Sequence, residues 1–203
     1  MTVSPGTADV FQLKITLRGI KPPIWRRVQV PGDILLPRLH RVFQVVMGWT
    51  DSHLHELRIG GRPYGQPSSD WGGYYAFPER SVRLWQVVMR PNTRFTYLYD
   101  FGDSWEHEVR VEKILAPEPG IHYPRCLGGV RSCPPEDCGG LAGYEEFLAA
   151  IRDPKHPEHA EMRDWIGGHF DSEAFDLDSV NRRLRRFRGQ AGGEKRGSRW
   201  QLV

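Results

Sequence analysis

Residues 10–30 read VFQLKITLRGIKPPIWRRVQV, and this stretch decides the fold. Apolar and polar residues alternate through its first half, which is the pattern of a strand with one buried face. That face would carry Phe11, Leu13, Ile15 and Leu17. After a Lys-Pro-Pro turn the alternation resumes, so the two segments predict a β-hairpin. The pattern of the second strand does not decide which of its faces is buried. One face carries Ile24, Arg26, Val28 and Val30, and the other carries Trp25, Arg27 and Gln29.

The hydrophobic period changes after residue 33 from two to that of a helix. Apolar residues recur at helical spacing over 36–47, and Gly48 is a natural end for this helix. HLHELRIGG at 53–61 predicts a third strand with His53 and His55 on the same side as the apolar residues. A second hairpin is predicted over 93–114, around the turn Phe-Gly-Asp-Ser.

The remaining segments predict connectors and short helices. Residues 60–79 indicate a long loop, and 81–89 fit either a strand or a short helix. Residues 116–140 hold five prolines, five glycines and all three cysteines, which predicts an irregular connector. Three helices are then expected at 143–151, 157–166 and 172–187, the last capped by Ser172.

This order of elements predicts one α+β domain over residues 9–187, between a flexible N-terminus at 1–8 and a flexible basic tail at 188–203. The sheet would be mostly antiparallel or mixed, with helices on one face and a C-terminal helical segment. A β-grasp-like arrangement is one form that it could take. No internal repeat and no doubly wound βα alternation is present.

Composition excludes several classes of protein. At 203 residues the chain can bury a core without disulfides, and no apolar run approaches the roughly 20 residues of a membrane helix. The first ten residues lack the basic and apolar regions of a secretory signal, so a soluble cytoplasmic protein is expected. Three cysteines, an odd number, argue against a disulfide framework.

Histidine and tryptophan side chains gather at predicted strand ends. If the strands pair as expected, a groove that holds a partner or an ion would be lined by Trp49, His53, His55, Asp103, Trp105 and His107. The plainer interpretation is that each histidine is partly buried and hydrogen-bonded to a backbone carbonyl or a carboxylate.

The same histidines also suggest a metal centre, because imidazole and thiolate are ligands that zinc prefers. The candidate ligands are His53, His55, His107, Cys126, Cys133 and Cys138, with Asp100 or Asp103 as oxygen ligands and His122 as a further imidazole. The cysteine spacing fits a zinc site only in part, and free thiols buried beneath a loop are the alternative. Zinc is the one cofactor that the sequence suggests.

No P-loop, G-x-G-x-x-G turn, G-x-S-x-G elbow or H-E-x-x-H helix occurs in the chain. A non-enzymatic binding or accessory module is the leading hypothesis, because Trp, His and Asp residues are dense at the predicted strand ends. A metal-dependent enzyme that uses a His/Cys/Asp site is the alternative, because a metal with an open position can activate water.

Basic residues are concentrated at the C-terminal end. The net charge is +3, yet residues 182–203 hold eight of the 28 basic residues and one of the 25 acidic ones, so the remainder is mildly acidic. A second alternative is non-specific nucleic-acid binding, which would be weakened by salt. The candidate contacts are Arg182, Arg183, Arg185, Arg186 and Arg188.

Several long motifs together resemble the plasmid pRiA4b ORF-3-like family. They are FQLKITLRGIKPPIWRRVQVPGD, LHRVFQVVMGWTDSHLHELRIGG, YLYDFGDSWEHEVRVEKI, YPRCLGGVRSCPPEDCGGLAGYEEFLAAI and FDLDSVNRRL. The resemblance covers about residues 9–187. It implies an α+β fold and a link to mobile elements, since some members are labelled insertion-element passenger proteins of the TnpR type. It implies no catalytic residues.

The sequence departs from the family pattern in two places. Leu35 stands where a Thr cap is expected before the first helix, and residues 66–79 form an aromatic-rich excursion. The first departure weakens the start of that helix, and the second reshapes the surface offered to a partner.

Overall fold

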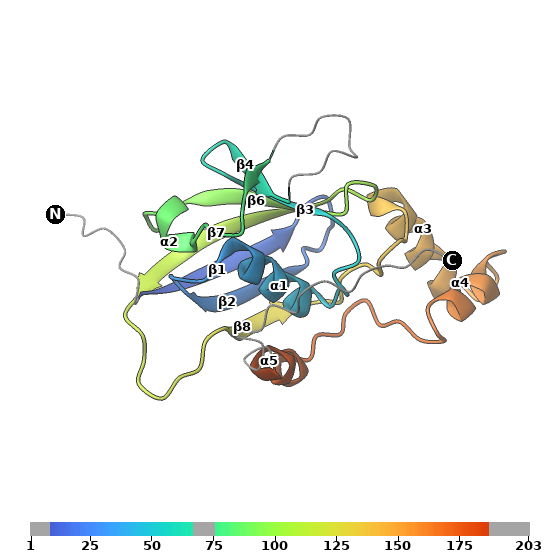
Figure 1. The fold of residues 1–203 in the computed structure, drawn as a ribbon. Helices are drawn as coiled ribbons and strands as arrows, with labels where there is room; N and C mark the ends of the chain where they lie inside the picture. Colours follow the sequence, from blue (N-terminus) through green and yellow to red (C-terminus); the bar gives the residue numbers. More distant parts are fainter. Residues whose placement is uncertain (1–8, 67–75, 187–203) are drawn as a thin grey trace, which may run out of the picture.

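The computed structural model describes residues 9–66 and 76–186, and an eight-stranded sheet forms the centre of this part of the chain (Figure 1). The strand order is β5-β4-β3-β6-β7-β1-β2-β8. The strands are β1 (Val10–Leu17), β2 (Trp25–Pro31), β3 (His55–Ile59), β4 (Arg62–Gly65), β5 (Phe77–Pro78), β6 (Arg94–Tyr99), β7 (Trp105–Leu115) and β8 (Arg125–Val130). All neighbours are antiparallel except β4 and β5, so the α+β class with a mixed, mostly antiparallel sheet is confirmed.

Both predicted hairpins form. In the first, Leu13 of β1 lies opposite Val28 of β2, and all four apolar residues predicted for the inner face of β1 are buried. The inner face of β2 is the one that carries Arg26 and Val28. On the opposite face, ion pairs link neighbouring strands, as between Arg18 and Glu106. The alternation in the sequence therefore places the core on one side of the sheet.

The helix α1 (Leu36–Met47) packs its apolar side against the sheet and ends at Gly48, whose φ of 96° suits glycine. Its N-cap, Leu35, makes no side-chain capping bond. The start of α1 is held instead by backbone bonds to the segment around α2 (Leu84–Val87), including Leu36 N–H to the carbonyl of Val82. The undecided segment 81–89 thus contains a short helix.

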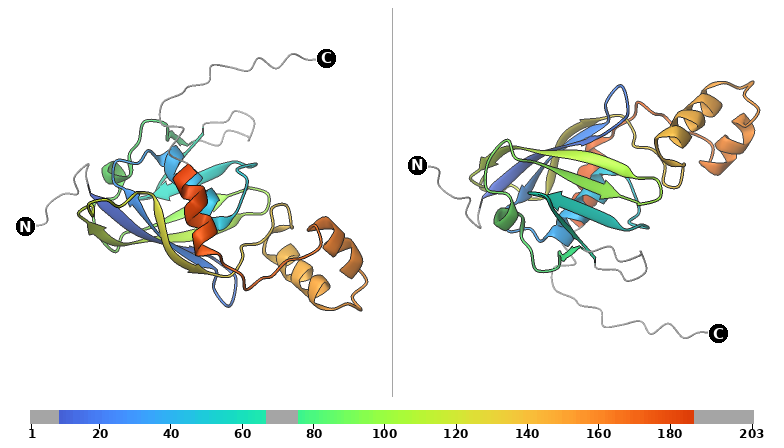
Figure 2. Two further views of the ribbon diagram at one scale, coloured as in Figure 1. Left: turned by 90° about the horizontal axis from the view of Figure 1, so that it is seen from below. Right: turned by 90° about the horizontal axis from the view of Figure 1, so that it is seen from above.

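The remaining helices lie at two places (Figures 1 and 2). The helix α5 (Leu177–Arg186) packs against β8 and α1, on the face of the sheet that α1 covers. The helices α3 (Gly140–Arg152) and α4 (His159–Trp165) pack on each other and project from one end of the sheet. No helix among the described residues is both long enough and apolar enough to cross a bilayer.

Three predictions about local structure were wrong. The loop predicted at 60–79 contains β4 and β5. The connector predicted at 116–140 contains β8. Its residues Gly128 and Gly129 are atypical of a strand, so the sequence did not indicate one there. Glycine is needed there, because a Cβ on Gly129 would lie 2.7 Å from Cδ of Arg26. The last helix begins at Leu177 and not near Ser172, since the Asp176 carboxylate accepts the N–H of Ser179 at 2.8 Å and so caps it.

The side chain of Arg26 joins four parts of the fold. Only 2% of the residue is exposed, and its guanidinium donates to the carbonyl of Val46 in α1 and to the carbonyls of Val130 and Arg131 at the end of β8. The guanidinium also lies 4.4 Å from the ring centre of Phe175, in the segment before α5. Among the described residues no carboxylate pairs with it, so backbone carbonyls satisfy the buried charge.

We expect Arg26→Met to lower the free energy of unfolding by about 3 kcal/mol or more, because several buried carbonyls lose their donor at once. Urea denaturation followed by circular dichroism measures this change. The matched control is Arg27→Met on the opposite face, where the pair with Glu112 is part-exposed and its loss should cost about 1 kcal/mol. Equal losses for the two variants would contradict the role given to Arg26.

Candidate functional site

Three segments far apart in the sequence meet at the end of the sheet from which α3 and α4 project. They are the residues that follow α1 (49–54), the β6–β7 turn (100–104) and the segment before α3 (131–139). Each contributes an aspartate with a positive φ, which Asp tolerates better than most residues: Asp51, Asp100 and Asp137. Side chains join these segments, as between Thr50 and Glu136 and between His53 and Asp100.

His53, Asp100 and Asp137 form a cluster of metal-ligating atoms at this junction. One donor atom from each lies within 4.8 Å of the other two. Nε2 of His53 is 3.1 Å from Oδ1 of Asp137 and 3.7 Å from Oδ2 of Asp100. The other oxygen of Asp100 accepts the N–H of Gly102 at 2.8 Å, which fixes this carboxylate in the turn.

The environment of His53 Nε2 is unusual for a polar atom. The atom is shielded from solvent, and it makes no hydrogen bond of acceptable geometry although two carboxylates are near. Asp137 is by contrast open to water, with 70% of its side chain exposed. The cluster is thus closed on the imidazole side and open on the Asp137 side.

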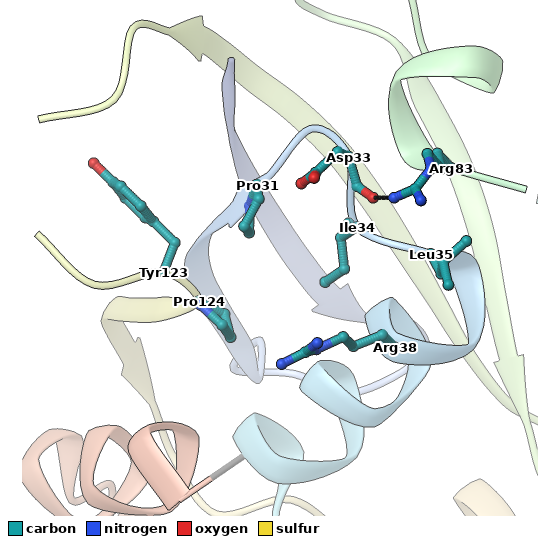
Figure 3. Close-up of a pocket in the computed structure, with 8 residues that line it drawn as sticks. All are labelled: Pro31, Asp33, Ile34, Leu35, Arg38, Arg83, Tyr123 and Pro124. Atoms are coloured by element: carbon teal, nitrogen blue, oxygen red, sulfur yellow. Dashed lines mark hydrogen bonds between the residues drawn. The ribbon is translucent and has the colours of Figure 1, made fainter. Parts of the chain in front are cut away.

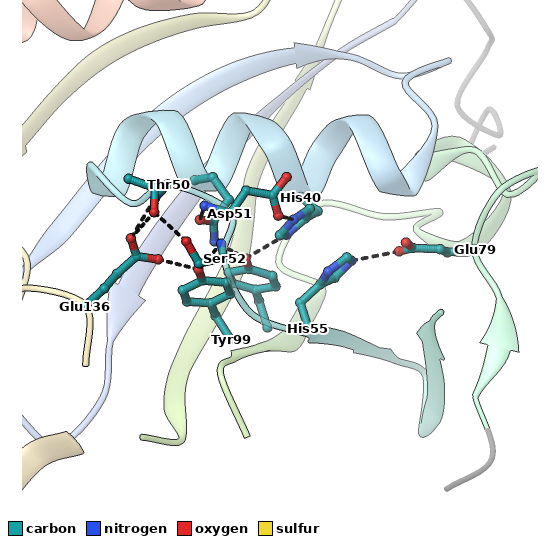
Figure 4. Close-up of polar contacts among 10 residues, drawn as sticks. His40, Thr50, Asp51, Ser52, His55, Glu79, Tyr99 and Glu136 are labelled. Carbon is teal, nitrogen blue, oxygen red and sulfur yellow. Dashed lines mark hydrogen bonds and ion pairs between the residues drawn. The ribbon is translucent and has the colours of Figure 1, made fainter. Parts of the chain in front are cut away.

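A hydrogen-bonded frame holds the loop that carries His53. The Glu136 carboxylate accepts the N–H of Thr50 at 3.0 Å and the hydroxyls of Thr50 and Tyr99. The Tyr99 hydroxyl accepts the N–H of Ser52 at 3.0 Å (Figure 4). Burial raises the pKa of Tyr99, as does its bond to Glu136, so the phenol stays protonated. Glu136 therefore fixes residues 50–52.

A stacked pair of histidines lies beside this frame. The rings of His40 and His55 are 3.5 Å apart and differ in orientation by 3°. His40 Nε2 is 2.6 Å from Asp51, its Nδ1 is 2.8 Å from the Tyr97 hydroxyl, and His55 Nε2 is 3.0 Å from Glu79.

The protonation of His40 follows from its partners. The Tyr97 oxygen accepts a bond from Gln44 Nε2, so the hydroxyl proton points to His40 Nδ1 and His40 donates from Nε2 to Asp51. Burial lowers the pKa of His40 despite the bond to Asp51, which agrees with a neutral ring. His40 is not among the site residues predicted from the sequence. The sequence feature that could have indicated His40 is a pair of polar residues, His40 and Gln44, four positions apart on the buried side of a predicted helix.

The structure gathers the six residues of the predicted groove at this end of the sheet, but at different depths. Four are buried in the core: Trp49, His55, Trp105 and His107. Trp49 donates its indole N–H to the carbonyl of Pro134 and stacks on Tyr99. His53 and Asp103 are the two members that are partly exposed.

The predicted metal ligands do not meet in one place. His53 is the one member of the predicted histidine and cysteine set that joins the cluster found in the described residues. His55 is paired with Glu79, and His107 Nδ1 faces the Tyr97 carbonyl at 3.2 Å. Asp100, suggested as an oxygen ligand, does belong to the cluster. The approach of Asp137 to His53 depends on tertiary structure.

The three cysteines are separate free thiols. Burial raises the pKa of Cys126, that of Cys133 to about 11 and that of Cys138 to about 12. Zinc binds the thiolate form, so these environments disfavour thiolate ligation. Cys133 packs against Met47, where its Sγ is 3.3 Å from the thioether sulfur. The alternative interpretation of buried thiols fits this arrangement.

The basic residues of the last helix face solvent. Val180 and Leu184 form the buried side of α5, while the arginines at 182, 183, 185 and 186 are exposed. Arg182 lies 3.9 Å from Asp176, a distant and exposed pair. Arg188 lies outside the described residues. Binding of nucleic acid by this surface stays a prediction.

A polar cleft lies beside the N-terminal end of α1 (Figure 3). Its volume is about 320 Å³, and Arg38, Arg83 and Tyr123 line it together with Asp33. Arg83 donates to the backbone carbonyl of Asp33. The Asp33 carboxylate offsets part of the positive charge, so we place no anion site here.

His107 provides a test of how the core responds to pH. It is fully buried, and burial lowers its pKa to about 4, below the value near 6.5 of an unfolded chain. Below pH 6.5 His107 becomes protonated in the unfolded chain, but it stays neutral in the folded chain until the pH approaches 4. Stability attributable to His107 should therefore fall between about pH 6.5 and 4, by about 3 kcal/mol in total.

We expect His107→Gln to make the free energy of unfolding less dependent on pH across this window, as measured by urea denaturation at a series of pH values. His122→Gln, a change at an exposed histidine, serves as the control and should keep the wild-type pH dependence. An unchanged dependence in His107→Gln would show that other groups, such as His40, account for it.

Comparison with known proteins shows which family the chain matches. Residues 9–179 match the family described as plasmid pRiA4b ORF-3-like protein. An uncharacterized protein, y4hQ of Sinorhizobium fredii, is 43% identical over 177 residues, which cover 86% of this chain and 90% of that protein. A crystal structure of MM3350, a protein of unknown function from Methanosarcina mazei, has a TM-score of 0.77 at 39% identity over 85% of this chain and 97% of that one. The chain belongs to the plasmid pRiA4b ORF-3-like family.

Proposed function

We propose that the protein is a non-enzymatic binding module that holds a divalent transition-metal ion at His53, Asp100 and Asp137. The single observation that carries this proposal is the shielded His53 Nε2, which lies between two carboxylates without a hydrogen bond. A metal ion that displaces the proton of Nε2 would find a nitrogen ligand there between two carboxylates. An imidazole with two carboxylates is a donor set for ions such as Mn²⁺ or Zn²⁺.

The spacing of the donors supports an ion of this size. Ligands about 2.1 Å from a metal are separated from one another by about 3 Å in regular geometries. The distances from Nε2 to the two aspartate oxygens, 3.1 and 3.7 Å, need a change of only a few tenths of an ångström. Three protein ligands leave further positions, and the exposed side of Asp137 directs these toward water or a partner.

A binding role is preferred to catalysis because the nearest acid–base groups are already engaged. Both oxygens of Glu136 accept bonds that hold residues 50–52, and the Tyr99 hydroxyl takes part in the same frame. A metal-dependent enzyme is the second candidate, and the open positions beside Asp137 favour it, since metal-bound water is a potential nucleophile. A link with mobile elements, which the family resemblance implies, stays a prediction.

The metal itself is the probe for the proposed site. We expect isothermal titration calorimetry of the EDTA-treated full chain with MnCl₂ and ZnCl₂ to give one site. Asp137→Asn and His53→Gln should each weaken it at least about tenfold, because each removes a ligand. Asparagine tolerates the positive φ at position 137, so the backbone is kept.

Asp103→Asn is the matched control, since this aspartate lies in the same β6–β7 turn but outside the cluster, and its variant should bind like the wild type. Full affinity in both ligand variants would exclude this site, as would absence of binding by the wild type. A metal-dependent hydrolysis that appears only with the bound ion would favour the enzyme over the binding module.

A further inference from the structure

A cleft lies between the helices α3 and α4. Its volume is about 280 Å³, and apolar side chains from both helices line it: Phe147, Met162 and Trp165. Phe147 is buried, whereas 47% of Trp165 is exposed, a large fraction for a tryptophan. The two rings are 5.6 Å apart and meet edge to face, so the indole is held in place at the surface.

Carboxylates surround this apolar lining. Glu146 of α3, Glu158 next to α4 and Asp137 all border the cleft. Glu146 and Glu158 are exposed, and within 9–66 and 76–186 no lysine or arginine forms an ion pair with either. The negative charge at the rim is therefore not neutralised by the described part of the chain.

A cleft with this lining selects a particular kind of partner. An arginine or lysine can pair with the rim carboxylates while its charge lies over an indole face, which adds a cation–π contribution. The apolar floor adds affinity for an aromatic or aliphatic neighbour of that basic residue. Nucleic acid and anionic lipid are repelled by the same carboxylates, and the volume suits one or two side chains.

We propose that the α3–α4 cleft binds a peptide segment of a partner protein in which a basic residue stands next to an aromatic one. Charge complementarity commits the site to this occupant. The position of the two helices agrees, because they project from one end of the sheet (Figure 2), and Trp165 in the lining of their cleft is exposed. The cleft shares Asp137 with the cation site, but Glu146, Glu158 and Trp165 lie outside the cluster, so changes at these three residues test the cleft alone.

The probe is a fluorescein-labelled hexapeptide of alternating arginine and tryptophan, titrated with the full chain by fluorescence polarisation. Two comparison peptides replace arginine by glutamate or tryptophan by serine. We expect saturable binding of the Arg-Trp peptide, binding at least fivefold weaker for each comparison peptide, and a loss of affinity as salt rises because exposed charges are screened.

Variants locate the binding in the cleft. The double change Glu146→Gln with Glu158→Gln and the single change Trp165→Ala should each weaken the Arg-Trp peptide at least fivefold. Glu145→Gln is the matched control, because this exposed neighbour on α3 lines a different cleft and should leave affinity unchanged. Trp165→Ala could also weaken binding by loosening the helix pair, so Trp165→Phe is measured beside it. Trp165→Phe keeps an aromatic ring and should retain most of the affinity.

Three results would overturn the proposal. One is equal binding by the wild type and the double glutamine variant. Another is equal affinity for the Arg-Ser and Arg-Trp peptides, which would indicate attraction by charge alone. The third is no saturable binding of the Arg-Trp peptide at millimolar protein.

Discussion

The guanidinium of Arg26 holds together parts of the chain that are more than 100 residues apart. It enters the core from β2 and gives its hydrogen bonds to carbonyls of α1 and of the end of β8. Because a buried charge is costly without partners, each of these carbonyls must stay in place. The position of Arg26 also requires glycine at position 129 of β8, since a side chain there would collide with Arg26 and Phe175.

This constraint reaches the candidate cation site through two short connections. The end of α1, fixed by Arg26 at Val46, leads directly to the loop that carries His53. The end of β8, fixed at Arg131, leads to the segment that carries Glu136 and Asp137. The third side of the site, the β6–β7 turn, is part of a hairpin at the centre of the sheet. The cluster thus lies where three rigid elements end.

The polar groups around this junction fall into two kinds. Tyr99, Glu136 and the His40–His55 pair have partners that account for their positions. His53 Nε2 has no hydrogen-bond partner, and the rim carboxylates of the α3–α4 cleft have no ion-pair partner among the described residues. Groups that the fold leaves unsatisfied suggest a ligand more strongly than satisfied ones do. The cation and peptide proposals rest on these atoms, whereas His107 Nε2 and Trp105 Nε1, which also lack a hydrogen-bond partner, are enclosed in the core.

The sequence by itself determined the two hairpins, α1 and the α+β class, because alternation and helical periodicity record which side of an element is buried. It also placed His55 and His107 on the inner face correctly. Only the tertiary structure decided that β8 completes the sheet, that His40 stacks on His55, and that Asp137 approaches His53. These contacts join segments that are distant in the chain. They depend on where loops converge and on residues with a positive φ, and local periodicity indicates neither of these features.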